Sequence, residues 1–164
     1  MPQTTNTIEK NFVTSVHVTS AEANPQAAYN ALAYILWANR IALAIVFIWF
    51  GFLKLIHASP AEPLVIRLHD VTVAKYIPMQ TFLMLLGGVE CIIGILWLMP
   101  RYTKAAFWLF VPQMITTFMP LILLPKDTWQ ASFCLTLTGQ YIIKNLVLVA
   151  SAITVLYMHT KMKK

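Results

Sequence analysis

One carboxylate stands near the middle of a long apolar run in this sequence. Glu90 lies within residues 82–99, where most neighbours are apolar, and a run of this length can cross a membrane as a helix. A carboxylate in hydrocarbon is costly unless it is protonated, paired or hydrated. Lys54 and Lys144 stand in other apolar runs and are the candidate partners. The sequence therefore predicts a buried ion pair between two membrane helices.

Depth along the helices favours Lys144 as the partner of Glu90. Glu90 lies about 18 Å from the outer end of its helix, and Lys144 lies about 10–14 Å in from the same side. Lys54 is one turn from the end of its own run, so its long side chain can reach the outer surface. We predict a Glu90–Lys144 pair with Lys54 nearby. Two lysines against one carboxylate would leave positive charge for an acceptor oxygen or an anion.

Each apolar run also carries polar or small residues at helical spacing, which places them on one face of a helix. The polar residues expected to join the acid and the lysines in a buried cluster or ligand site are Gln113, Thr117, Gln140 and Asn145. The small residues that would let a neighbouring helix approach closely are Gly51, Gly87 and Gly94.

Two interpretations of this cluster stay open. An ion pair of this kind can serve only to fix helix register and bundle geometry. It can also form part of a binding site for a polar head, such as a quinone carbonyl or a small anion. Proton relay has less support, because a single carboxylate lacks a chain of titratable partners. No residue is predicted to be catalytic.

The composition identifies the class of protein. Of the 164 residues, 59% are hydrophobic and only 11% are charged, whereas soluble domains carry about 25% charged residues. The chain is therefore predicted to be an all-α integral membrane protein of one domain, a transmembrane four-helix bundle in a lipid bilayer. Basic residues give a net charge of +6, but they stand mostly at the ends of apolar runs. They indicate helix anchoring and not nucleic-acid binding.

The chain divides into a polar tail at 1–24, a transmembrane domain at 25–160 and a basic tail at 161–164. Asn24 and Pro25 are typical of a helix N-cap and first helical position. The predicted membrane spans are at about 38–57, 79–99, 105–124 and 135–157.

The connections between the spans differ in character. Residues 58–77 form an outer loop that is apolar enough to contain a short surface helix. Pro112 and Pro120 lie inside the third span and predict kinks there. Residues 125–132 are expected to form a short loop, with Trp129 as an anchor at the membrane interface.

The basic residues predict the orientation of the chain. The termini and the turn between the second and third spans share one side, which collects Lys10, Arg40, Arg101, Lys104, Lys161, Lys163 and Lys164. The cations on the other side are Lys54, Arg67, Lys75 and Lys126, and acidic residues there lower the net positive charge. The positive-inside rule then places both termini in the cytoplasm.

Metal and haem chemistry is not predicted. The histidines stand in the tail, in the outer loop or near the C-terminus, so no two face each other from the middle of membrane helices as a b-type haem requires. His57, His69 and Asp70 are a weak metal candidate beside a solvated loop. Cys91 and Cys134 lie far apart and are predicted to be free thiols.

Four short motifs follow one another along the apolar runs. They are Arg40, then Gly51-Phe52-Leu53-Lys54, then Gly87-Gly88-Val89-Glu90 followed by Gly94, and then Gly139-Gln140-Tyr141-Ile142-Ile143-Lys144-Asn145. Their order and spacing resemble the DoxX-like family of small membrane proteins over residues 40–152. Ser59-Pro60-Ala61-Glu62-Pro63 resembles a small bacterial branch of that family.

The resemblance implies a four-helix bundle in a bacterial inner membrane. Some DoxX-like proteins are associated with quinone-linked sulfur oxidation or membrane redox complexes. An accessory redox role is therefore expected, with quinone as the candidate ligand and redox proteins or a second copy as candidate partners. The family's glutamate corresponds to Glu90, and its lysines to Lys54 and Lys144. Relatives often carry His where this chain has Gln113, which weakens proton transfer there. A small-solute transporter or channel, and a structural partner of another membrane protein, are the alternatives.

Overall fold

The computed structural model describes residues 25–161 and shows an all-α chain. Within this range the segments long and apolar enough to cross a membrane are Gln26–Leu55, Met79–Leu98, Pro100–Leu123 and Leu137–Lys161. The prediction of a multi-pass membrane protein with a four-helix arrangement is confirmed. The predicted N-cap at Asn24, the polar tail and the last three residues of the basic tail lie outside the described residues.

Helix α2 spans Pro25–Leu55 and begins at the predicted first position. The chain divides between Ile35 and Leu36 into two units. In the first unit Gln26 donates a hydrogen bond of 3.3 Å to Asn30, one turn further along the helix. The second unit contains everything described below.

Helix α3, Glu62–Thr72, is the surface helix expected in the outer loop. His57, with φ of 53°, lies between α2 and α3, where the chain changes direction. The buried side chains of α3 are Leu68 and His69. His69 Nε2 is 2.7 Å from the carbonyl oxygen of Ile77, which holds the end of α3 against the connection to the next helix.

Helices α4 (Met79–Leu98) and α5 (Thr103–Phe118) are joined by the short 3-10 turn η1 (Pro100–Tyr102). The two expected proline kinks have different outcomes. Pro112 lies inside continuous α5, whereas Pro120 begins a separate one-turn helix, α6 (Pro120–Leu123). A proline is well tolerated at the first position of a helix, because its missing N–H has no partner there in any case.

The connection from α6 to the last span is more ordered than the short loop that the sequence predicts. It contains α7 (Pro125–Thr128) and a small antiparallel hairpin of β1 (Trp129–Ala131) and β2 (Cys134–Leu135). Thr136 Oγ1 donates to the carbonyl oxygen of Asp127 at 2.7 Å. Trp129 Nε1 donates to the carbonyl oxygen of Leu121 at 3.0 Å. These bonds fix the hairpin to the ends of the neighbouring helices.

The last span consists of two helices, α8 (Leu137–Lys144) and α9 (Leu146–Lys161), and not of one as predicted. The interruption is at Asn145, whose Nδ2 donates to the carbonyl oxygens of Tyr141 and Ile142, both at 3.1 Å. An asparagine side chain that bonds the preceding turn competes with regular helix bonding. This local competition explains the break.

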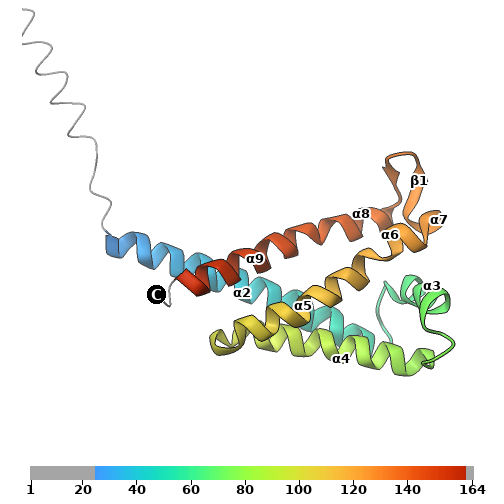
Figure 1. The fold of residues 1–164 in the computed structure, drawn as a ribbon, viewed down its shortest axis with the longest axis horizontal. Coiled ribbons are helices and arrows are strands. Elements are labelled where there is room, and N and C mark those ends of the chain that lie inside the picture. The colour runs from blue at the N-terminus through green and yellow to red at the C-terminus, as the bar shows by residue number, and fades with distance from the viewer. Residues whose placement is uncertain (1–24, 162–164) are drawn as a thin grey trace, which may run out of the picture. The chain divides into compact units, whose positions relative to one another are not determined.

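Helices α2, α4, α5 and α9 share one hydrophobic core. Its fully buried members include Leu43, Ile93, Trp97, Ala106, Ala152 and Val155. Figure 1 shows α5 and α6 diverging from α4 towards the end where α3 lies. The core therefore occupies the end of the bundle where α4 and α5 meet.

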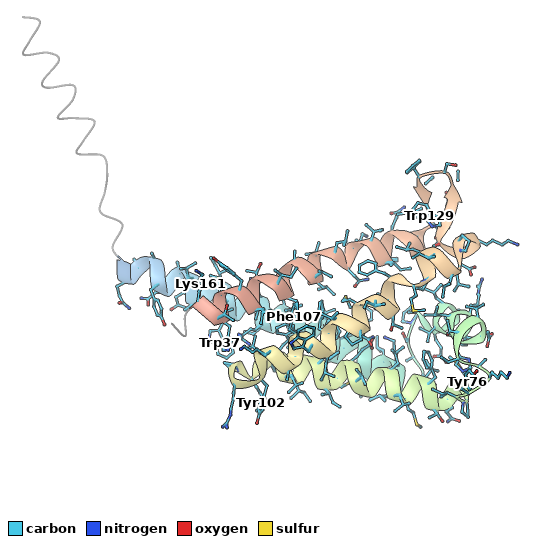
Figure 2. The ribbon with its side chains drawn as sticks, in the orientation of Figure 1. Trp37, Tyr76, Tyr102, Phe107, Trp129 and Lys161 are labelled. Carbon is cyan, nitrogen blue, oxygen red and sulfur yellow. The ribbon has the colours of Figure 1, made fainter. Side chains whose placement is uncertain are left out.

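Aromatic side chains mark both ends of the bundle. Figure 2 shows Trp37 and Tyr102 near the end that contains Lys161, and Tyr76 and Trp129 at the opposite end. Trp and Tyr are enriched at membrane–water interfaces because one part of each ring system is apolar and another is polar. This placement agrees with the anchoring role predicted for Trp129, and Trp37, Tyr76 and Tyr102 lie at corresponding ends of the bundle.

Candidate functional site

Glycines on α2 and α4 bring the buried lysine and glutamate together. A Cβ atom added to Gly51 would lie only 2.7 Å from the carbonyl oxygen of Gly87, so the two backbones touch here. Lys54 and Glu90 each follow their glycine by three residues and therefore lie on the same helix face as that glycine. The close helix contact positions the cation directly against the carboxylate.

Lys54 and Glu90 form a buried ion pair. Lys54 Nζ lies 2.6 Å from Glu90 Oε2, and the two residues are only 6% and 7% exposed. The short distance identifies a charge-assisted hydrogen bond. This ion pair satisfies one of the two carboxylate oxygens.

Gln113 of α5 completes a polar cluster, defined here as Lys54, Glu90 and Gln113. Gln113 Nε2 donates to Glu90 Oε1 at 2.7 Å, and Gln113 is itself buried. Each carboxylate oxygen of Glu90 thus accepts one hydrogen bond, from α2 on one side and from α5 on the other. The cluster links three of the four membrane helices.

The polar cluster borders a cavity of about 760 Å³ that is lined mainly by apolar residues. Phe82, Leu86 and Glu90 line it along successive turns of α4, so Glu90 is the lining residue farthest from the start of that helix. Cavities of roughly 300–1,000 Å³ with apolar walls and a few polar groups are typical small-molecule sites. The arrangement suits an apolar molecule with one polar head.

The predicted Glu90–Lys144 pair is wrong. Lys144 is exposed, and its Nζ lies 4.7 Å from the centre of the Tyr141 ring. Gly139 and Ile142 are the buried residues of α8, and Lys144 lies two residues beyond Ile142. Two residues along a helix correspond to a rotation of about 200°, so Lys144 points away from the bundle. The predicted excess positive charge is therefore absent from the polar cluster.

The remaining predicted site residues divide into two groups. Thr117 and Asn145 line the cavity and are half-buried, and Thr117 Oγ1 donates to the carbonyl oxygen of Gln113 at 2.9 Å. Gln140 is exposed, and its Nε2 lies 3.5 Å from the carbonyl oxygen of Leu135. Gln140 therefore does not belong to the site.

The predicted packing glycines are all buried at close contacts between α2 and α4. Gly87 lies against Gly51, and a Cβ atom on Gly94 would lie 3.0 Å from the carbonyl oxygen of Ala44. These contacts are the kind of close helix approach that the sequence predicts at the three small residues.

An exposed ion pair lies at the edge of the cavity. Arg67 of α3 and Asp127 of α7 both line the cavity, and Arg67 Nη1 donates to Asp127 Oδ1. This pair is not predicted from the sequence, because the two residues stand in separate connections between the spans with no shared pattern. The bond connects α3 to α7, which lies between the last two spans.

A second buried cation, Arg40, lies outside the cavity and was not predicted to be buried. Arg40 is 1% exposed. Its Nη1 donates to the carbonyl oxygen of Trp97 at 3.1 Å, and its Nη2 to Thr103 Oγ1 at 2.7 Å. The last carbonyl groups of a helix lack partners within the helix. Arg40 therefore caps the end of α4 and fixes it to the start of α5.

The described part of the chain contains no cluster of metal-ligating side chains. Among residues 25–161, no three His, Cys, Asp or Glu side chains are close enough together to hold a metal ion. His57 and His69 of the weak metal candidate each have an acidic residue nearby, Glu62 and Asp70 respectively. Cys91 and Cys134 are free thiols, as predicted.

The chain matches no protein-family model, no curated protein and no solved structure.

Proposed function

We infer that this membrane protein binds a quinone in the cavity beside Glu90, as an accessory component of membrane redox metabolism. The observation that carries this proposal is the Lys54–Glu90–Gln113 cluster at one part of a largely apolar cavity. The motif resemblance to DoxX-like proteins supports the same assignment.

The chemistry of the polar cluster matches a quinone head. A lysine ammonium group has three N–H donors, and the bond to Glu90 uses one of those on Lys54. A second donor can reach a carbonyl oxygen of a ligand in the cavity. Phe50, Phe82 and Leu86 line the same cavity and provide an apolar surface for the ring.

Co-purification tests this proposal directly. The full chain is purified in mild detergent from quinone-containing membranes, and bound quinone is extracted and measured per protein. Wild type is expected to retain quinone, whereas Glu90→Gln and Lys54→Met are expected to lose it. Lys144→Met is the matched control, because Lys144 is exposed and outside the cavity.

The control and the alternatives give distinct results. Absence of quinone from the folded wild type, or equal retention by the Lys54 and Lys144 variants, would contradict the proposal. Solute flux through proteoliposomes that contain only this chain would favour a transporter or channel. Loss of another membrane protein when this chain is deleted, without quinone binding, would favour a structural partner.

The proposed location is a bacterial inner membrane, with both termini in the cytoplasm. Arg101 and Lys104 are exposed in and next to the turn between α4 and α5, and the positive-inside rule assigns such a turn to the cytoplasm. Membrane-impermeant labelling of single cysteines checks this orientation. A cysteine at Lys104 should be protected in intact cells, and a cysteine at Lys75 should be labelled.

A further inference from the structure

The hydrogen bond to Glu90 fixes which way the Gln113 amide faces. An ionised carboxylate only accepts hydrogen bonds, so the NH₂ group of Gln113 must face Glu90 Oε1, from which it lies 2.7 Å away. The carbonyl oxygen of the same amide is therefore turned away from the carboxylate. Its orientation follows from the ion pair between Glu90 and Lys54.

The carbonyl oxygen of Gln113 has unused capacity to accept a hydrogen bond. Over residues 25–161 no group donates to it. The Gln113 oxygen is also not completely covered by neighbouring atoms. In that range, the one side-chain nitrogen or oxygen that is completely covered and has no hydrogen-bond partner is Trp97 Nε1. Gln113 lines the cavity. A buried amide oxygen of this kind is available to a ligand in the cavity.

The same part of the cavity offers both a donor and an acceptor. Lys54 bonds one oxygen of Glu90 and Gln113 bonds the other, so both side chains adjoin one carboxylate. Lys54 has further N–H donors, and Gln113 has a free carbonyl oxygen. A hydroxyl group can accept from the first and donate to the second, whereas a carbonyl oxygen can only accept.

We propose that Gln113 determines specificity at this site by selecting a hydroxyl-bearing head, which means the reduced hydroquinone over the oxidised quinone. This inference rests on the proposed function. In the oxidised complex the Gln113 oxygen would be left without a donor inside the protein, which is unfavourable for a buried acceptor. In the reduced complex the ligand hydroxyl supplies that donor.

The test measures the affinities of two forms of one probe for the full chain in detergent under anaerobic conditions. The probes are tetramethylhydroquinone and the corresponding quinone. Wild type should bind the hydroquinone about fivefold more tightly, the effect of one additional hydrogen bond. Gln113→Leu should bring the two affinities level. Gln140→Leu, the same change at an exposed glutamine outside the cavity, should retain the preference.

A methylated probe makes the test independent of any variant. The dimethyl ether of the hydroquinone keeps the ring and both oxygens but has no O–H, and it should bind wild type no more tightly than the quinone does. Equal or tighter binding of the quinone by wild type would overturn the role of Gln113 and leave quinone binding intact. A preference that survives in folded Gln113→Leu would do the same. Binding of none of the probes would contradict the proposed function itself, and this inference with it.

Discussion

Two buried cations in this bundle have different surroundings. They are 14 residues apart on α2, which corresponds to about 21 Å along the helix. Within residues 25–161, Arg40 bonds two neutral groups, the carbonyl oxygen of Trp97 and the hydroxyl of Thr103. Lys54 bonds the carboxylate of Glu90 and borders a cavity.

The difference distinguishes a structural cation from one that a ligand can use. Arg40 is almost completely enclosed and caps a helix end, so its guanidinium group donates its hydrogen bonds to the protein itself. Lys54 has a counter-charge, spare N–H donors and open space beside it. Burial of a charge does not by itself indicate a binding site; the unused hydrogen-bonding capacity of Lys54 beside a cavity is what supports the proposed one.

The largest expected effect comes from removing one charge of the buried pair. Glu90→Leu should lower the free energy of unfolding by about 3 kcal/mol, because Lys54 would remain buried without its counter-charge. The double variant Lys54→Met, Glu90→Leu should recover most of this loss, because no unpaired charge remains. Thermal and denaturant unfolding in detergent measure both values.

The double variant also separates stability from function. The double variant should be folded yet bind no quinone. If the ion pair only fixes helix register, the folded double variant should bind as much quinone as wild type does. Quinone retained by the double variant at the wild-type level would remove the distinction drawn between Lys54 and Arg40.

The second effect concerns the other cation. Arg40→Met should lower the free energy of unfolding by about 2 kcal/mol, since two hydrogen bonds from a charged donor are lost. Folded Arg40→Met should bind quinone as wild type does. Lys104→Met, which removes an exposed cation near the same turn, is the control and should leave stability almost unchanged. A selective loss of quinone in Arg40→Met would contradict the structural assignment of Arg40.

The helix contact beside Lys54 gives a smaller effect. Gly51→Ala places a Cβ atom 2.7 Å from the carbonyl oxygen of Gly87, so α2 and α4 must separate. We expect a loss of about 1–2 kcal/mol together with weaker quinone binding, because Lys54 moves with α2. Gly88→Ala is the matched control, since no atom lies within 4 Å of the added Cβ. Equal stability of these two variants would argue against the close contact.

The smallest effect is expected at the edge of the cavity. Arg67 and Asp127 form an ion pair in which the Arg67 side chain is 57% exposed. Asp127→Ala should cost less than about 1 kcal/mol, and added salt should reduce this difference further. Unfolding measured at low and high ionic strength checks the prediction. A loss as large as that of Glu90→Leu would show that α3 contributes much more to stability than its exposed position indicates.

The fold was predictable from sequence to a large extent, because apolar runs of membrane-spanning length indicate membrane helices by their length and composition. The breaks within the spans were less predictable. The interruption at Asn145 depends on a side chain that bonds the preceding turn, and the hairpin of β1 and β2 depends on contacts with α6 and α7.

The members of the polar cluster were predicted, but the pairing was not. Depth along the helices favours Lys144 as the partner of Glu90. This prediction failed because depth does not specify how a residue is rotated about the helix axis. The face of α8 that is buried turns Lys144 outward, and the contact of Gly51 with Gly87 brings Lys54 inward. The burial of Arg40 likewise depends on the turn between α4 and α5, which a single apolar run does not reveal.

Photolabelling with an azidoquinone tests the central claim most directly, because it reports which of the two regions a quinone contacts. The labelled full chain is digested and the modified residues are identified by mass spectrometry, with unlabelled quinone as competitor. Adducts should form on cavity residues such as Met114 and Tyr141, should disappear with competitor and should be absent from the Lys54→Met, Glu90→Leu variant. Adducts around Arg40 and Trp97, or labelling spread over the lipid-facing surface without competition, would contradict the account.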